Sequence, residues 1–259
     1  MKDIFSLEGK KAVIIGGGGD LGCAVATGLI SKGAEVAIVD LNKTALHNAL
    51  SKIEEETGKK ALGFSADVTS EEEVENLAKD VVEIMGTVHI LVNSQGYNKK
   101  FPAFEFPMDE WDKIYAVNVR SMMICSKFFG RYMKEQNYGK IINLSSIASR
   151  YGVTNDTSIG YASSKGAVNS ITTTLAAGWA KHNITVNGIC PILTVTGMMI
   201  PILEANPQIK ESIGQRVPLG NRLGLPQDIV GPVLFFASDA SAFVTGQLLC
   251  IDGGLSTLQ

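Results

Sequence analysis

The chain has 259 residues, of which 45% are hydrophobic and 19% are charged, and its formal net charge is −3. This composition is ordinary for a globular protein and is enough for one large domain with a substantial core. No basic excess is available to neutralise a phosphate backbone, which argues against a general nucleic-acid binder. No apolar run is long enough to span a bilayer, and the first residues contain no secretory signal.

Short β-rich runs alternate with helical patterns along the chain. The expected strands cover residues 13–15, 35–40, 61–66, 88–93, 140–144, 184–189 and 247–251. The expected helices cover residues 24–29, a segment ending near 57, 70–85, a segment around 111, 119–136, 161 to about 182, and 227–238. This alternation predicts an α/β fold, a doubly wound parallel sheet of about seven strands with helices on both faces.

Two local signals add to this pattern. Ser70 followed by Glu73 is typical of a capping box that starts a helix. The region from Pro191 to about Arg222 reads as irregular, and it is unusually long for a connection within a compact domain. We therefore predict one domain over residues 1–259, with a lid over a site at residues 191–222.

The four cysteines are scattered, at positions Cys23, Cys125, Cys190 and Cys250. They form no Cys-x-x-Cys pair and have no histidine at ligand spacing, so the sequence predicts no metal site. Three of them fall in segments expected to be buried, which favours reduced core thiols. A cytoplasmic location is the default for such a chain.

A glycine-rich turn, Ile15-Gly-Gly-Gly-Gly-Asp-Leu-Gly22, joins the first expected strand to the first helix. Glycines let the backbone turn sharply beside a pyrophosphate, and the helix N-terminus adds partial positive charge. At this position in the βαβ series the turn predicts a dinucleotide site, with Asp40 about 20 residues further on. A carboxylate there accepts hydrogen bonds from ribose hydroxyls and repels a 2′-phosphate, so NAD(H) is expected over NADP(H). The alternative is that Asp40 or Asn42 only caps the next helix.

Tyr161 and Lys165 lie four residues apart in an expected helix and therefore share one face, one turn apart. A phenol has a pKa near ~10, and a neighbouring ammonium stabilises its ionised form. Such a pair can move a proton on or off an alcohol or carbonyl oxygen. The spacing also occurs by chance, so its meaning depends on the other motifs.

Taken together, these residues resemble the short-chain dehydrogenase/reductase family over essentially the whole chain. The motifs that carry the resemblance are Gly16 and Gly22, Asp67-Val68, Asn93-Ser94-Gln95-Gly96, Asn118, Ile142-Asn-Leu-Ser-Ser146, Tyr161 with Lys165, Val186-Asn-Gly-Ile-Cys-Pro191 and Val244-Thr-Gly-Gln with Ile251-Asp-Gly-Gly254. The resemblance implies a Rossmann-like fold. It also implies a cofactor site made of Gly16, Gly18, Asp20, Leu21, Gly22, Asp40, Leu41, Asp67, Val68, Asn93, Gly96, Tyr161, Lys165, Pro191, Thr194 and Thr196.

The resemblance also implies the catalytic roles. Hydride moves between nicotinamide and a carbinol or carbonyl carbon, while Tyr161 acts as general base or acid. Lys165 lowers the pKa of Tyr161 and holds the nicotinamide ribose. Ser146 hydrogen-bonds the substrate oxygen. Asn118 completes a proton relay, and Thr196 binds the carboxamide.

Two neighbours compete for these roles. Of the adjacent serines, Ser146 is expected to be catalytic because Ser145 points away across the pleat. Tyr151 has no lysine four residues later, so it is expected to be a pocket wall or a surface residue.

The chain departs from the family pattern at three positions. Ile15 replaces the threonine before the first glycine and removes a hydrogen bond that braces the loop. Asp20 replaces the middle glycine, where its carboxylate faces the phosphate region or serves as N-cap of the first helix. Ile192 replaces the glycine after Pro191 and puts the backbone of the nicotinamide-side loop in question.

The substrate is indicated by the loop that follows Gly96. In this fold the loop lies beside the substrate pocket, and Lys99 with Lys100 can bind a carboxylate; the alternative is a solvated loop. Arg150 is a second candidate anion contact. In detail the chain is similar to the gluconate 5-dehydrogenase and 2-deoxygluconate 3-dehydrogenase branch of the family. This implies a polyol or sugar-acid substrate that contacts Lys99, Lys100, Ser146, Arg150 and Tyr161.

Other functions stay open. A 3-oxoacyl thioester reductase is the first alternative, although that chemistry usually prefers NADPH and Asp40 argues against it. Apolar alcohols such as steroids would suit the Met198-Met199-Ile200 run. A non-catalytic dinucleotide-binding scaffold has no need to retain all four catalytic residues. The resemblance further implies a homotetramer or homodimer.

Overall fold

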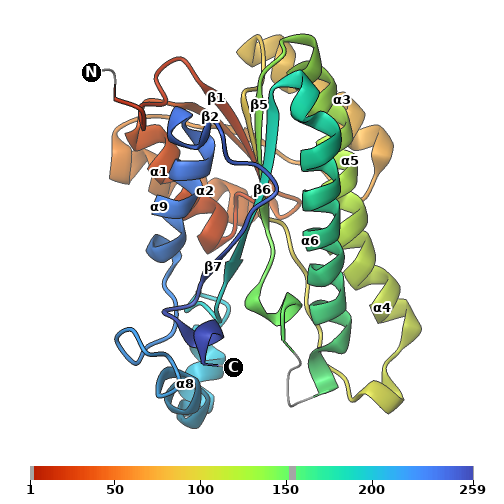
Figure 1. Cartoon of the computed structure of the whole chain (residues 1–259), viewed down its shortest axis with the longest axis vertical. Coiled ribbons are helices and arrows are strands. Elements are labelled where there is room, and N and C mark those ends of the chain that lie inside the picture. Colours follow the sequence, from red (N-terminus) through yellow and green to blue (C-terminus); the bar gives the residue numbers. More distant parts are fainter. Residues whose placement is uncertain (1–2, 152–155, 259) are drawn as a thin grey trace.

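A seven-stranded parallel sheet forms the centre of the computed structural model, which describes residues 3–151 and 156–258 (Figure 1). Its strands are β1 (Lys11–Ile15), β2 (Glu35–Val39), β3 (Leu62–Phe64), β4 (Ile90–Asn93), β5 (Gly139–Leu144), β6 (Ile184–Pro191) and β7 (Leu248–Ile251). They are ordered β3-β2-β1-β4-β5-β6-β7, and every pairing is parallel. The predicted single-domain α/β fold is confirmed.

Helices cover both faces of the sheet. The α-helices are α1 (Asp20–Ser31), α2 (Lys43–Thr57), α3 (Glu71–Met85), α4 (Met108–Tyr115), α5 (Ser121–Glu135), α6 (Ile159–Trp179), α7 (Ile200–Ala205), α8 (Pro207–Gly214) and α9 (Val230–Ala237). Helices α1, α2 and α9 pack on one face, and α3, α5 and α6 pack on the other (Figure 1). None of the helices that the structure describes combines the length and apolarity needed to cross a bilayer.

The burial of the strands explains their composition. All residues of β4 and β5 are buried, as are the last four of β1, because both sides of a central parallel strand face helices. The edge strands β3 and β7 are more exposed. Sequential strands run outward from β1 in one direction and from β4 in the other. The carboxyl ends of β1 and β4 therefore form the switch point where such sheets bind ligands.

Several boundaries differ from the sequence prediction. Helix α1 begins at Asp20 rather than Ala24, and β3 is limited to Leu62–Phe64. The helix expected from Val119 begins with a π-helical turn, η2, at Ala116–Arg120. The irregular region predicted at 191–222 contains α7 and α8, and Pro201 and Pro207 stand near their first residues, where proline suits a helix.

The predicted capping box is half formed. Ser70 accepts a hydrogen bond from the backbone of Glu73 at 3.3 Å, as a helix N-cap does. The Glu73 carboxylate accepts from the backbone of Asp67 at 2.8 Å instead of turning back to Ser70. The contact therefore ties the turn after β3 to α3.

The cysteines that the structure describes are free: Cys23, Cys125 and Cys190 are buried, and Cys250 on the edge strand is partly buried. Burial raises the pKa of the Cys23, Cys125 and Cys190 thiols. These three thiols therefore stay protonated at neutral pH, as expected of core residues.

Candidate active site

The glycine turn after β1 packs too closely for side chains. A Cβ on Gly16, which has φ of +73°, would lie 2.7 Å from the backbone nitrogen of Gln95, and one on Gly22 would lie 2.3 Å from the Gly16 carbonyl oxygen. The turn therefore presents bare backbone directly before the N-terminus of α1. This is the cradle that a dinucleotide diphosphate requires, and the residues present fit such a group.

Asp40 follows β2 and braces this turn. Its carboxylate accepts hydrogen bonds from the backbone of Gly18 at 3.0 Å and of Asn42 at 2.9 Å. Asn42 is the N-cap of α2, accepting from Thr44 and Ala45. The capping role that competed for Asp40 therefore belongs to Asn42, and Asp40 is held at the edge where a ribose would lie.

The remaining predicted cofactor residues lie at the carboxyl ends of other strands. Asp67 follows β3, and its carboxylate accepts from the backbone and hydroxyl of Thr69 at 2.9 and 2.6 Å. Asn93 ends β4, is buried, and donates to Asn143 at 2.9 Å. Gly96 is placed so that a Cβ would lie 3.8 Å from both the Asn118 amide oxygen and the Lys165 ammonium. Three predicted residues are more peripheral: Leu41 is 65% exposed, and Leu21 and Val68 are half-buried against the core.

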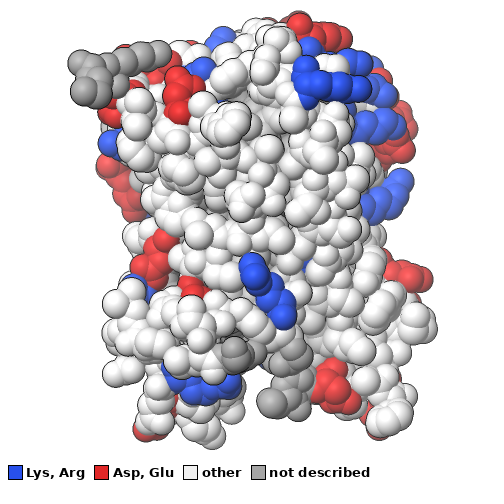
Figure 2. Space-filling model, viewed as in Figure 1, with Lys and Arg blue, Asp and Glu red and all other residues white. Residues whose placement is uncertain are grey.

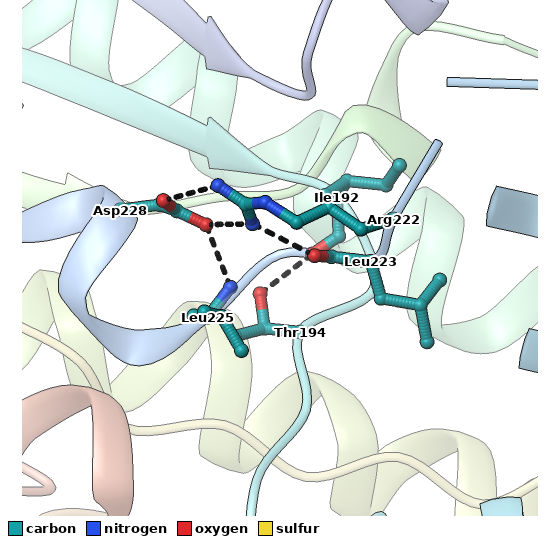
Figure 3. Close-up of polar contacts among 6 residues, drawn as sticks. All are labelled: Ile192, Thr194, Arg222, Leu223, Leu225 and Asp228. Atoms are coloured by element: carbon teal, nitrogen blue, oxygen red, sulfur yellow. Dashed lines mark hydrogen bonds and ion pairs between the residues drawn. The ribbon is translucent and has the colours of Figure 1, made fainter. Parts of the chain in front are cut away.

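The base of the predicted lid is held by a compact set of polar contacts, shown in Figure 3. Arg222 binds Asp228 through both guanidinium nitrogens, at 2.6 and 2.8 Å, and Asp228 also accepts from the backbone of Leu225 at 2.7 Å. The Thr194 hydroxyl donates to the Ile192 carbonyl at 2.8 Å. Thr194 and Gly224 are paired as an isolated parallel bridge. The two ends of the lid are therefore joined beside the carboxyl end of β6.

Ile192 does not distort this loop. In the described part of the chain, the non-glycine residues with positive φ are Asn137, Asn183 and Asn221. Ile192 therefore has an ordinary backbone conformation, and its side chain is buried. The loss of the family's glycine carries no backbone strain here.

The residues predicted to transfer a proton lie where β5 meets α6. Ser146 follows β5 and its hydroxyl accepts from the backbone of Ala148 at 3.1 Å. Tyr161 lies in the first turn of α6 and hydrogen-bonds Ser146, while Ser145 instead donates to the Lys165 carbonyl at 3.2 Å. Ser146, rather than Ser145, therefore lies beside the phenol.

The electrostatics of the pair differ from the prediction. Burial raises the pKa of Tyr161, and the hydrogen bond from Ser146 opposes that rise. Burial lowers the pKa of Lys165 to about 8, and its ammonium donates to the Leu144 carbonyl at 2.7 Å. The ammonium lies 5.6 Å from the centre of the Tyr161 ring. The ammonium is thus bonded to the Leu144 carbonyl, and the expected lowering of the Tyr161 pKa is not present in this arrangement.

Asn118 connects the two halves of the site. It lies in the π-helical turn η2, a type of bulge frequent at functional sites. Its amide oxygen accepts from the Tyr97 backbone at 2.7 Å, and its amide nitrogen donates to the Tyr97 carbonyl and the Ser164 hydroxyl, each at 2.9 Å. The side chain is thus engaged in fixing the loop after β4 against α6.

Sequence reasoning missed Ser164, which is fully buried and donates to the Tyr161 carbonyl at 2.7 Å. Its spacing three residues after Tyr161 was the available signal, since residues i and i+3 share a helix face. Glu110 was also missed as a partner of this loop. It accepts from the Tyr97 hydroxyl at 2.9 Å and from Lys99 at 2.6 Å.

The three predicted anion contacts differ in their availability. Lys99 is neutralised by Glu110, whose hydrogen bond raises the pKa of the ammonium. Lys100 is exposed and has no ion pair within the described residues. Arg150 is exposed and makes a long hydrogen bond, 3.4 Å, to the Leu248 carbonyl.

Comparison with known proteins agrees with this geometry. The family model described as enoyl-(acyl carrier protein) reductase matches residues 19–256. The chain is 36% identical over 255 residues to 5-keto-D-gluconate 5-reductase of Escherichia coli strain K12, covering 98% of each protein. A gluconate 5-dehydrogenase from Burkholderia cenocepacia J2315, solved with NADP and tartrate, superposes with a TM-score of 0.91 at 32% identity, covering 98% of each chain. An NAD+-bound xylitol dehydrogenase superposes with a TM-score of 0.89 at 33% identity, covering 96% of this chain and 99% of the other. The chain is a member of the short-chain dehydrogenase/reductase family.

Proposed function

We propose that this chain is an NAD(H)-dependent oxidoreductase that interconverts a secondary alcohol and a ketone on a sugar acid or polyol. The observation that carries the proposal is the meeting of Tyr161, Ser146 and Lys165 beside the switch point that also holds the glycine turn. The names of the related proteins, a gluconate dehydrogenase, a ketogluconate reductase and a xylitol dehydrogenase, support the substrate class.

In the proposed reaction the cofactor transfers the hydride, and residues of the chain transfer the proton and hold the reactants. The nicotinamide, when bound, accepts or supplies the hydride and adds a positive charge in its oxidised form. Tyr161 gives a proton to the substrate oxygen in reduction and removes it in oxidation, while Ser146 donates a hydrogen bond to that oxygen. Lys165 holds the ribose, and its ammonium keeps positive charge near the phenolate. Asn118 keeps the loop after β4 against α6 through its hydrogen bonds to Tyr97 and Ser164.

The cofactor preference depends on Asp40. We expect Asp40→Asn to raise kcat/KM for NADP(H) at least about tenfold, because it removes a negative charge that faces a 2′-phosphate. The same change lowers kcat/KM for NAD(H) several-fold, since a neutral amide accepts ribose hydrogen bonds less strongly than a carboxylate. Asparagine retains an oxygen for the Gly18 amide, so the turn stays braced.

Initial rates with both cofactors measure this effect. Asp80→Asn is the matched control. Asp80 is exposed on α3, so its substitution removes the same charge at a position away from the glycine turn. An unchanged NADP(H) to NAD(H) ratio in Asp40→Asn would show that Asp40 does not set the preference.

The anion anchor is expected at Lys100. Its exposed ammonium has no ion pair within the described residues, whereas that of Lys99 is paired with Glu110. Lys100→Ala should raise KM for sugar acids about tenfold with little change in kcat, and Lys99→Ala should have a smaller effect. A neutral polyol is the control substrate, because it has no carboxylate to lose. If a variant carrying both Lys99→Ala and Lys100→Ala left KM for every sugar acid unchanged, this loop would not be the anchor.

The reaction itself is tested with a substrate panel. Sugar acids, polyols, 3-oxoacyl thioesters and steroid alcohols are offered with NAD(H) and NADP(H), and the absorbance of the reduced nicotinamide is followed. Turnover confined to sugar acids and polyols is the expected result. Turnover of thioesters with NADPH would favour the reductase alternative, and turnover of steroids would favour an apolar pocket under Met198, which is 83% exposed in the lid. No turnover together with NAD binding would favour a scaffold.

A homo-oligomer is part of the proposal, and the family resemblance implies a tetramer. The face that carries α6 and β7 is mostly uncharged (Figure 2). On the edge strand β7, Leu249 is 41% exposed, and Phe243 just before it is fully exposed. Apolar groups of this kind are stabilised by contact with a second copy. Light scattering on the purified chain measures the number of subunits.

A further inference from the structure

Asp20 is a departure in the glycine turn to which the proposed function gives no role. It is the first residue of α1, and the N-cap is Gly19, so the alternative role of Asp20 as N-cap is wrong. Its carboxylate accepts a hydrogen bond from the backbone nitrogen of Gly197 at 2.6 Å. The carboxylate therefore joins the glycine turn to the start of the lid, 177 residues away in the sequence.

The lid is otherwise held at its ends. At its base, the Val195 nitrogen donates to the Gly224 carbonyl at 2.8 Å, beside the Arg222–Asp228 pair of Figure 3. Towards its C-terminal end, the Leu219 nitrogen donates to the Gly253 carbonyl at 2.9 Å. Within the described part of the chain, the other hydrogen bonds recorded for residues 196–218 stay inside this segment. Asp20 thus supplies the bond that fixes the beginning of the lid against the glycine turn.

The carboxylate also acts through its charge. The N-terminus of α1 carries partial positive charge that favours a diphosphate, and a carboxylate in the first turn offsets part of it. Two negative groups within a few ångströms of each other repel in a partly desolvated site. The hydrogen bond and the charge therefore have opposite effects on a bound dinucleotide.

We propose that Asp20 is a positioning residue that fastens the lid across the nucleotide site through the Gly197 amide, and that its charge limits how tightly the diphosphate is held. Fastening keeps the lid in place, and the charge favours release of the cofactor after each turnover. The effect of the Asp20 charge on cofactor affinity rests on the proposed function, whereas the hydrogen bond to Gly197 is a property of the chain alone.

Hydrogen exchange of the purified chain without cofactor tests the fastening bond. Asp20→Ala removes the acceptor and the charge, while Asp20→Asn retains an acceptor oxygen. We expect the peptide containing Gly197 to exchange about tenfold faster in Asp20→Ala and within about threefold of the parent chain in Asp20→Asn. Asp3→Ala is the matched control, because it loses a similar bond, 2.9 Å to the Phe5 backbone, far from the lid. Parent-like exchange in Asp20→Ala would overturn the fastening role.

Titration of the same variants with NADH tests the charge. Asp20→Asn is expected to bind NADH about tenfold more tightly than the parent chain, and Asp20→Ala about fivefold less tightly than Asp20→Asn. Equal affinity of Asp20→Asn and the parent would overturn the charge role. Failure of every form to bind NADH would overturn the proposed function and the charge role together, while the exchange experiment would still decide the fastening bond.

Discussion

Tyr161→Phe is expected to lower kcat by about a thousandfold in both directions of the reaction. Phenylalanine has the same shape but no hydroxyl, so no group remains at this position to give the substrate oxygen a proton or remove one. The affinity for NADH should change by less than about tenfold, because at most one hydrogen bond to the cofactor is lost. Single-turnover rates and an equilibrium titration with NADH measure the two quantities separately.

Tyr151→Phe is the matched control for this experiment. Tyr151 also follows β5 closely, and among the described residues its hydroxyl makes one long hydrogen bond, 3.4 Å, to the Ser256 carbonyl. It should retain kcat within about threefold of the parent. A Tyr161→Phe variant that turned over at the parent rate would refute the proton-transfer role, and so would an equal loss in both variants.

The regular elements could be predicted because their signals are local. Val13 to Ile15 and Val36 to Val39 are continuous apolar runs of the length a buried parallel strand requires. The glycine turn and the spacing of Tyr161 and Lys165 are also local. Their meeting follows from the parallel order of the strands, which places every carboxyl end at one edge of the sheet.

The contacts that differ from the prediction depend on packing between distant segments. Lys99 was expected to be available to an anion, but the start of α4 brings Glu110 within 2.6 Å of it. The bond from Gly197 to Asp20 depends on where the lid comes to lie, which no local pattern in either segment encodes. The pKa of Tyr161 could not be predicted from a local pattern either, because it depends on how deeply the packing of distant segments buries the phenol.

Lys165→Met is expected to abolish activity and, at the same time, to stabilise the folded chain. Lys165 is 3% exposed, and burial lowers its pKa from 10.5 to about 8. A shift of that size corresponds to about 3 kcal/mol by which burial destabilises the charged form relative to the neutral one. Methionine fills similar space without a charge, so we expect about 2 kcal/mol more free energy of unfolding at pH 7 after loss of the bond to Leu144. Urea unfolding of both forms measures the difference.

The pH dependence of this difference is a stricter test. Below pH 8 the lysine is charged in both the folded and the unfolded chain, so the cost of burial is fully present. Between about pH 8 and 10.5 the folded chain releases its proton first, and the cost declines as the pH rises. The advantage of Lys165→Met should therefore shrink towards zero across this window. A variant that is less stable than the parent at pH 7 would contradict the expectation.

Lys140→Met shows the effect of removing a buried lysine charge on stability without removing a residue of the proposed site. Lys140 is also 3% exposed, and burial lowers its pKa. Within the described part of the chain, the hydrogen bonds of its ammonium are two long ones, each 3.4 Å, to Ser241. It lies on β5 at the end of the sheet opposite Ser146, away from the residues proposed to transfer a proton. This variant should gain stability at pH 7 for the same reason as Lys165→Met while retaining activity. A loss of activity only in Lys165→Met, with a gain of stability in both, would show that the active site retains a buried charge at a measurable cost to the fold.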